Sequence, residues 1–141
     1  MNPEKQALIS AALEQAVLAR IAAADPLTLQ PHVVPVWFLW DGQALWISAF
    51  SSTRKVKLLQ RNPRISVLIE PKEGSLELQA VLLEGAAELI AEPRAQVAEM
   101  SGRIYARYLG EQGALAPEPL SWTTDPENRL IKLVPERILT W

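Results

Sequence analysis

The chain contains no cysteine and a single histidine, His32, among its 141 residues. These absences exclude disulfides and thiolate chemistry, and they leave no cluster of metal-ligating side chains, so we expect no metal site. Glycine is scarce, with 6 residues, and the patterns GxGxxG, GxxxxGK and GxSxG do not occur. Nucleotide loops and the serine-hydrolase elbow are therefore not expected. Any enzyme activity would depend on a cofactor rather than on side-chain chemistry.

Two polar features have ordinary interpretations beside functional ones. His32 could be a general acid or base or a ligand contact, but a polar residue at the start of a strand is the simpler interpretation. Glu84 and Glu88 have no partner acid, so glycosidase-type catalysis has no support. The catalytic residues stay unknown at this level.

Long apolar runs are also missing. None approaches the 18 residues of a membrane span, and the N-terminal "MNPEKQALIS" has no basic segment followed by an apolar one. With 49% hydrophobic residues and a net charge of −2, the composition fits one packed domain over residues 1–141. We expect a cytoplasmic protein with no membrane partner and, without an excess of basic residues, no nucleic-acid partner.

Hydrophobic periodicity predicts an antiparallel barrel with attached helices. A helix starts after Asn2, and the apolar "VLARIAAA" after it is compatible with a first strand. Strands are expected at 32–40, 44–50, 65–70, 76–90 and 129–134, with a type I′ hairpin at Asp41-Gly42 and a bend at Gly85. A helix is expected at about 93–109, ended by Gly110, and a loop at 111–120.

The stretch "SSTRKVKLLQRNPR" (51–64) holds five of the 14 basic residues and no acid. It predicts a helix capped by Ser51 or Ser52 and stopped at Asn62-Pro63. Arg54 and Lys55 then fall in the first turn, where the helix dipole makes each cation unfavourable by about 0.3–1 kcal/mol. Two interpretations stay open: both side chains extend into water, or the helix start and the hydroxyls before it surround a phosphate.

The stretch "PHVVPVWFLW" (31–40) is apolar at nearly every position, which predicts a strand covered on both faces. Pro35 argues for an edge, a bulge or a barrel mouth instead of a central strand. The aromatic residues Trp37, Phe38 and Trp40 either border a planar ligand or pack in the core or at a subunit interface.

Together, "ADPLTLQPHVVPVWFLWDGQALWIS", "SSTRKVKLLQRNPRISVLIE" and "AVLLEGAAELI" resemble the pyridoxamine 5′-phosphate oxidase-like, FMN-binding split β-barrel superfamily. The likeness covers most of residues 16–141. It implies a mainly β fold with helices (α+β), namely a six- or seven-stranded antiparallel split β-barrel with helices near the N-terminus, at the phosphate site and in the C-terminal half. It also implies a homodimer with the flavin at its interface.

Carried over by position, the resemblance implies that Arg54 and Lys55 grip the flavin phosphate and that Ser52 and Thr53 add donors. Ser48 and Ala49 would close over the ring. The strand whose backbone borders the ring would be Val33, Val34, Pro35, Val36 and Trp37. Gln79 lies one position off the spacing expected for a flavin-contacting glutamine, and Trp37, Trp46 and Trp141 are candidates for the pocket wall.

The resemblance implies a flavin-dependent oxidoreductase that transfers hydride between FMN and a small organic substrate. A deazaflavin-dependent reductase and a non-enzymatic protein that binds or stores flavin or haem are the alternatives. True pyridoxamine-phosphate oxidases carry a C-terminal Arg-x-His motif that is absent from this sequence, so vitamin B6 oxidation is not expected.

Overall fold

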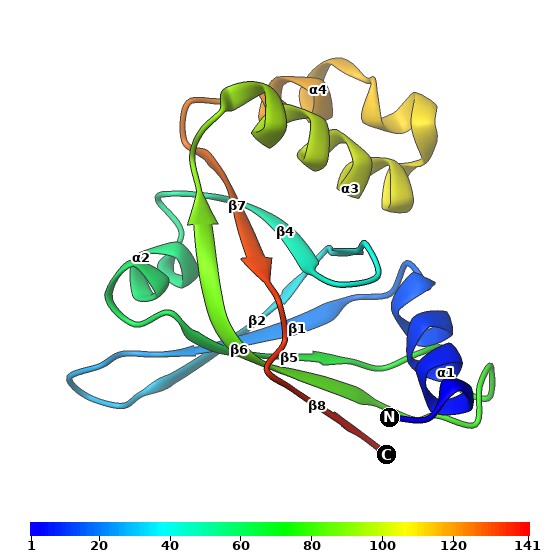
Figure 1. Ribbon diagram of the computed structural model, residues 1–141. Helices are drawn as coiled ribbons and strands as arrows, with labels where there is room; N and C mark the ends of the chain where they lie inside the picture. The colour runs from blue at the N-terminus through cyan, green and yellow to red at the C-terminus, as the bar shows by residue number, and fades with distance from the viewer.

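A computed structural model describes residues 1–141. The helices are α1 (Pro3–Glu14), α2 (Arg54–Arg61), α3 (Arg94–Ala114) and α4 (Pro117–Thr123). The strands are β1 (Ala19–Ala24), β2 (Pro31–Val36), β3 (Leu39–Trp40), β4 (Leu45–Phe50), β5 (Arg64–Ile69), β6 (Val81–Ile90), β7 (Asn128–Leu133) and β8 (Arg137–Thr140). Figure 1 shows a curled sheet with α3 and α4 together above β4 and β7, while α1 and α2 lie on opposite sides.

All strand pairs are antiparallel, in the order β2-β1-β5-β6-β7-β4-β3, and β8 pairs with β6. The two ends of this path, β2 and β3, follow each other in the chain, so the sheet curls until Trp37 and Phe38 connect its ends. Counted with β2 and β3 as one interrupted strand, the sheet has seven strands. The predicted split barrel, mainly β with attached helices, is confirmed.

Strand β6 joins the two halves of the barrel. Residues 81–84 pair with β8, and residues 87–90 pair with β7. Gly85 lies between these segments, where an added Cβ would be 3.0 Å from Leu133 Cδ1 and 3.3 Å from the backbone nitrogen of Glu136. The strand changes partners at Gly85 because the chain leaving β7 passes close to its backbone. It begins at Val81, later than the residue 76 expected from the sequence.

The stretch 31–40 differs from its prediction. The chain leaves the sheet at Trp37 and Phe38, so only β2 and the two-residue β3 are strands. Coverage of both faces is wrong for this chain alone, because the side chain of Val33 is 59% exposed. The edge position indicated by Pro35 is confirmed by β2 at one end of the sheet. Of the hairpin residues only Gly42 has a positive φ, at 102°, so the turn is not type I′.

The helix starts follow the sequence closely. Asn2 caps α1, and its Oδ1 accepts from the Lys5 backbone N–H at 2.8 Å. The N-cap of α2 is Thr53 rather than Ser51 or Ser52, and the helix stops before Asn62-Pro63 as predicted. Gly110, with φ at 77°, interrupts α3.

Residues 111–120 are not the expected loop. A further helical turn follows Gly110, and α4 begins at Pro117, whose fixed φ suits the first helical turn. A short final strand, β8, also forms where no strand was expected.

Two apolar clusters form the core. The larger lies inside the barrel around Ile21, Phe38 and Ile47. The smaller lies between α3 and the β4–β7 side, around Trp46, Ile104 and Leu130. No helix combines the length and apolar character needed to cross a membrane.

Candidate functional site

The start of α2 has unsatisfied donors. Thr53 is the N-cap, but its hydroxyl donates to the Phe50 carbonyl at 2.7 Å and makes no capping bond. The first backbone N–H groups of a helix have no partner within the helix. No acidic residue occupies the first turn. The positive end of α2 is therefore open to an anion.

Lys55 stands in this first turn and differs from the other cations of residues 51–64. Arg61 pairs with Asp25 at 3.6 Å and Arg64 pairs with Glu136 at 3.0 Å, whereas Arg54, Lys55 and Lys57 form no ion pair. Of these three, only Lys55 is not exposed. Lys55 is half-buried, and this burial lowers the pKa of its amine because it disfavours the charged form. A half-buried cation without a counter-charge fits a site for an anionic ligand.

Two adjoining cavities meet at Lys55. Ser48, Lys55 and Tyr105 line both of them. The first, about 390 Å³, is otherwise lined by Leu18, Pro35, Val36, Trp37 and Ile104. The second, about 270 Å³, is otherwise lined by Ala49, Phe50, Thr53, Trp122 and Asn128. Each is near the lower end of the size range of small-molecule pockets, and Lys55 is the one charged residue that lines them.

A closed hydrogen-bond network lies beneath the junction of the cavities. Ser48 Oγ donates to Asn128 Oδ1 at 2.8 Å and receives a bond from Ser101 Oγ at 3.0 Å. Asn128 Nδ2 donates to Ser101 Oγ at 2.9 Å, and the Tyr105 hydroxyl lies 3.0 Å from Ser48 Oγ. Burial raises the pKa of Tyr105, so its phenol stays protonated at neutral pH. The network can orient a ligand and supplies no ready base.

Aromatic rings form one wall of the site. Trp37 stacks on Tyr108, with ring centroids 4.9 Å apart and planes 6° apart. Tyr105 packs edge-to-face with Trp37 and with Trp122, with ring centroids 6.2 Å and 5.7 Å apart. These rings exclude water from the site and suit a flat ligand.

The structure brings together most of the residues that the sequence nominated. Those lining the cavities are Pro35, Val36, Trp37, Ser48, Ala49, Thr53 and Lys55. Four others line neither cavity. Ser52 and Arg54 are exposed beside the site, Val34 packs against the barrel core, and Val33 points out of the barrel.

Other nominated residues lie elsewhere. Trp46 is buried and donates to Asp41, Trp141 is 59% exposed, and neither lines the two cavities. Gln79 is exposed and precedes β6; its backbone N–H donates to the Trp141 carbonyl at 2.7 Å. His32 is half-buried on β2 and lines neither cavity.

Sequence reasoning missed the lining residues that come from distant segments. These are Leu18, Phe50, Ile104, Tyr105, Trp122 and Asn128. Ser101 and Tyr105, four apart beside the apolar stripe of α3, were a usable signal for a polar inner face. Nothing in the local sequence points to Trp122 or Asn128.

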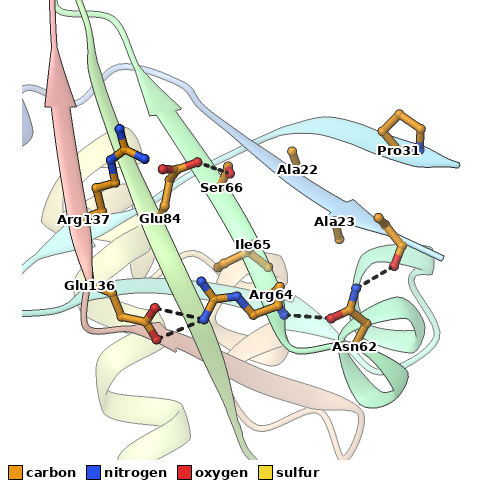
Figure 2. Close-up of a pocket in the computed structure, with 11 residues that line it drawn as sticks. Ala22, Ala23, Pro31, Asn62, Arg64, Ile65, Ser66, Glu84, Glu136 and Arg137 are labelled. Atoms are coloured by element: carbon orange, nitrogen blue, oxygen red, sulfur yellow. Dashed lines mark hydrogen bonds and ion pairs between the residues drawn. The ribbon is translucent and has the colours of Figure 1, made fainter. Parts of the chain in front are cut away.

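A larger hollow of about 610 Å³ lies on the outer face of β1, β5 and β6. Figure 2 shows Arg64 reaching both carboxylate oxygens of Glu136, while Glu84 points toward Ser66. Arg137, opposite Glu84 on β8, is exposed and forms no ion pair. None of the nominated site residues lines this hollow.

The family model described as pyridoxamine 5′-phosphate oxidase matches residues 6–141. No curated protein sequence matches the chain. Solved structures do. The conserved hypothetical protein Rv2991 from Mycobacterium tuberculosis is 22% identical, with a TM-score of 0.78 over 100% of this chain and 84% of that one.

An F420 reductase is 18% identical, with a TM-score of 0.71 over 92% of this chain and 94% of that one. General Stress Protein 26 from Bacillus anthracis is also 18% identical, with a TM-score of 0.70 over 97% and 93% of the two chains. At these identities the structural likenesses bear on the fold alone.

Proposed function

The chain belongs to the pyridoxamine 5′-phosphate oxidase family, and from that premise we propose that it binds FMN in the two cavities that meet at Lys55. We further propose that it acts as an oxidoreductase on a small organic substrate. A bound flavin supplies the hydride chemistry. The chain's own residues anchor, orient and shield it.

The observation that carries this proposal is Lys55, a half-buried cation without an acidic partner at the open start of α2. A phosphate placed there meets the Lys55 amine and the first N–H groups of the helix. Thr53 lines the same cavity, but its backbone N–H and its hydroxyl both donate to the Phe50 carbonyl, so the free donors are the N–H groups that follow it. Arg54 is exposed one position earlier and attracts the phosphate from the solvent side.

The remaining lining residues suit a flat heteroaromatic ring. Pro35, Val36 and Trp37 offer one wall, and Ser48 with Ala49 offers the opposite strand. The hydroxyls of Ser48 and Tyr105 provide the polar contacts near Lys55. Apart from Lys55, which is assigned to the phosphate, no strong base or nucleophile lines the site, which agrees with a protein whose role is to position its cofactor.

Fluorescence titration of the purified protein tests the proposal, because a flavin loses mobility and changes emission when bound. We expect saturable FMN binding in the micromolar range or tighter. The F420 reductase likeness makes a deazaflavin the second ligand to titrate. Tighter binding of the deazaflavin would move the proposal to a deazaflavin-dependent reductase, and no saturable binding of either would refute it. Flavin binding without turnover of any hydride acceptor or donor would favour a storage role.

We also propose a homodimer, formed through the outer face of β2, β1, β5, β6 and β8. Leu68, Leu82 and Leu139 are neighbours across three strands on this face and are only half-buried. A sheet face meant for water carries polar residues at such positions. Polar side chains such as Arg20, Ser66 and Glu84 share this face, but the three adjacent leucines form an apolar row across it, which supports a partner that covers them.

Charge complementarity supports a second copy as that partner. Glu84 and Arg137 lie opposite each other on β6 and β8, and neither forms an ion pair. Across a twofold axis each can meet the opposite charge of the other copy. Leu18 and Pro35, at the edge of the same face, line the larger cavity beside Lys55, so a second copy would cover its mouth.

Replacing Val33 by glutamate is expected to break the dimer, because Val33 is 59% exposed on this face and its replacement disturbs no core contact. The matched control is Leu120→Glu, which introduces the same charge at a 48% exposed leucine on α4. Light scattering after size exclusion measures the mass of each variant. A monomeric wild-type protein, or a Val33→Glu variant that stays dimeric, contradicts the proposal.

A further inference from the structure

The barrel is open where the chain passes from β2 to β3. Trp37 and Phe38 belong to neither strand, so their backbone groups lack the ladder partners of a closed sheet. The segment before β1 faces the same problem at Val17. Buried backbone groups require hydrogen bonds from another source.

One side-chain hydroxyl from α3 supplies partners to Phe38 and Val17. The Phe38 backbone N–H donates to the Tyr108 hydroxyl at 3.1 Å, and that hydroxyl donates to the Val17 carbonyl at 2.8 Å. The Arg107 guanidinium lies 5.0 Å from the Phe38 ring centroid and donates to the Gln15 carbonyl at 3.0 Å. Two consecutive residues of α3 therefore tie the end of α1, the start of β1 and the β2–β3 break together.

The bridged groups stand beside cavity-lining residues. Val17 precedes Leu18, and Phe38 follows Trp37, and both Leu18 and Trp37 line the cavity of about 390 Å³. The Tyr108 ring also stacks on Trp37 at 4.9 Å. The single hydroxyl thus fixes the separation of two chain segments that border one cavity.

We propose that Tyr108 is a positioning residue that holds Trp37 in the orientation that contacts the ligand. The inference rests on the proposed flavin binding for its ligand. Its structural part, the control of Trp37 by the hydroxyl bridge, is independent of which ligand binds.

Tyr108→Phe isolates the hydroxyl, because the ring and its stacking on Trp37 are retained while the bridge is lost. We expect the FMN dissociation constant to rise about tenfold. In a Trp37→Ala background the same substitution is expected to change it less than about twofold, because the ring that Tyr108 positions is already absent. A purely structural role predicts that Tyr108→Phe raises the FMN dissociation constant by the same factor in the wild-type and Trp37→Ala backgrounds. That result would overturn the proposal.

A readout without ligand separates this inference from the proposed function. In the ligand-free Tyr108→Phe variant, the Phe38 amide hydrogen is expected to exchange with solvent at least about tenfold faster. The fluorine NMR signal of 5-fluorotryptophan at position 37, assigned through Trp37→Phe, is expected to shift and broaden. If wild-type protein binds no flavin but both changes occur, the positioning role stands and the flavin proposal fails. If Phe38 exchange and the Trp37 signal are unchanged, the positioning role is refuted.

Discussion

Replacing Lys55 by glutamate is expected to raise the FMN dissociation constant at least about a hundredfold without unfolding the protein. The substitution places a carboxylate where the phosphate is proposed to bind, and it replaces attraction by repulsion within a half-buried site. Lys55 makes no ion pair in the chain, so no structural contact is lost with it. Fluorescence titration gives the affinity, and circular dichroism checks the fold.

Lys57→Glu is the matched control, because Lys57 is exposed on the same helix and lines neither cavity. It changes the net charge equally and should leave the FMN affinity within about threefold, since exposed charges are largely screened. Equal losses in the two variants would show a general charge effect and contradict the assignment of Lys55.

Titration of Lys55 adds a pH dependence with a defined sign. Burial lowers its pKa below 10.5, and a bound phosphate favours the protonated amine. FMN affinity is therefore expected to fall as pH rises through this lowered pKa. Lys55→Arg should remove the alkaline loss, because a guanidinium stays charged in that range. If FMN affinity depended on pH identically in the wild-type protein and in Lys55→Arg, the phosphate would not bind at Lys55.

Replacing Asn128 by leucine is expected to destabilise the fold by about 3 kcal/mol, because buried polar groups lose their partners. Asn128 is fully buried, and its amide connects Ser48, Ser101 and the Thr123 carbonyl. Leucine has a similar size but offers none of these bonds. Thermal unfolding should show a melting temperature lower by about 10 °C.

Ser101→Ala provides a graded comparison, because it removes one hydroxyl of the network and leaves the Asn128 bonds to Ser48 and Thr123 in place. Its loss should be about 1 kcal/mol. An Asn128→Leu variant as stable as the wild-type protein would show that the network contributes nothing to the fold. A loss in Ser101→Ala equal to that in Asn128→Leu would place the cost at Ser101 alone.

The sequence predicted most helix and strand positions because these depend on neighbours along the chain, and the family resemblance added the split barrel. Alternating apolar residues and the Asp41-Gly42 turn marked the strands and a hairpin. The loop predicted at 111–120 was wrong because Gly113 and two prolines suggest a loop, while packing of α4 against α3 stabilises a helix there. The prediction that both faces of β2 are covered was wrong, because nothing within this chain packs on the outer face of that strand.

The same distinction between local and long-range features applies to the candidate site. The sequence alone determined that a hydroxyl-rich turn and two cations open α2, because these residues are adjacent in the chain. Only the tertiary structure decided that Lys55 turns into the cavities while Arg54 stays exposed, and that Tyr105, Trp122 and Asn128 meet them there. Ser48 and Asn128 are 80 positions apart, and no local pattern encodes a contact across that distance. Such contacts form because the curled sheet brings β4 beside β7 and places α3 over both.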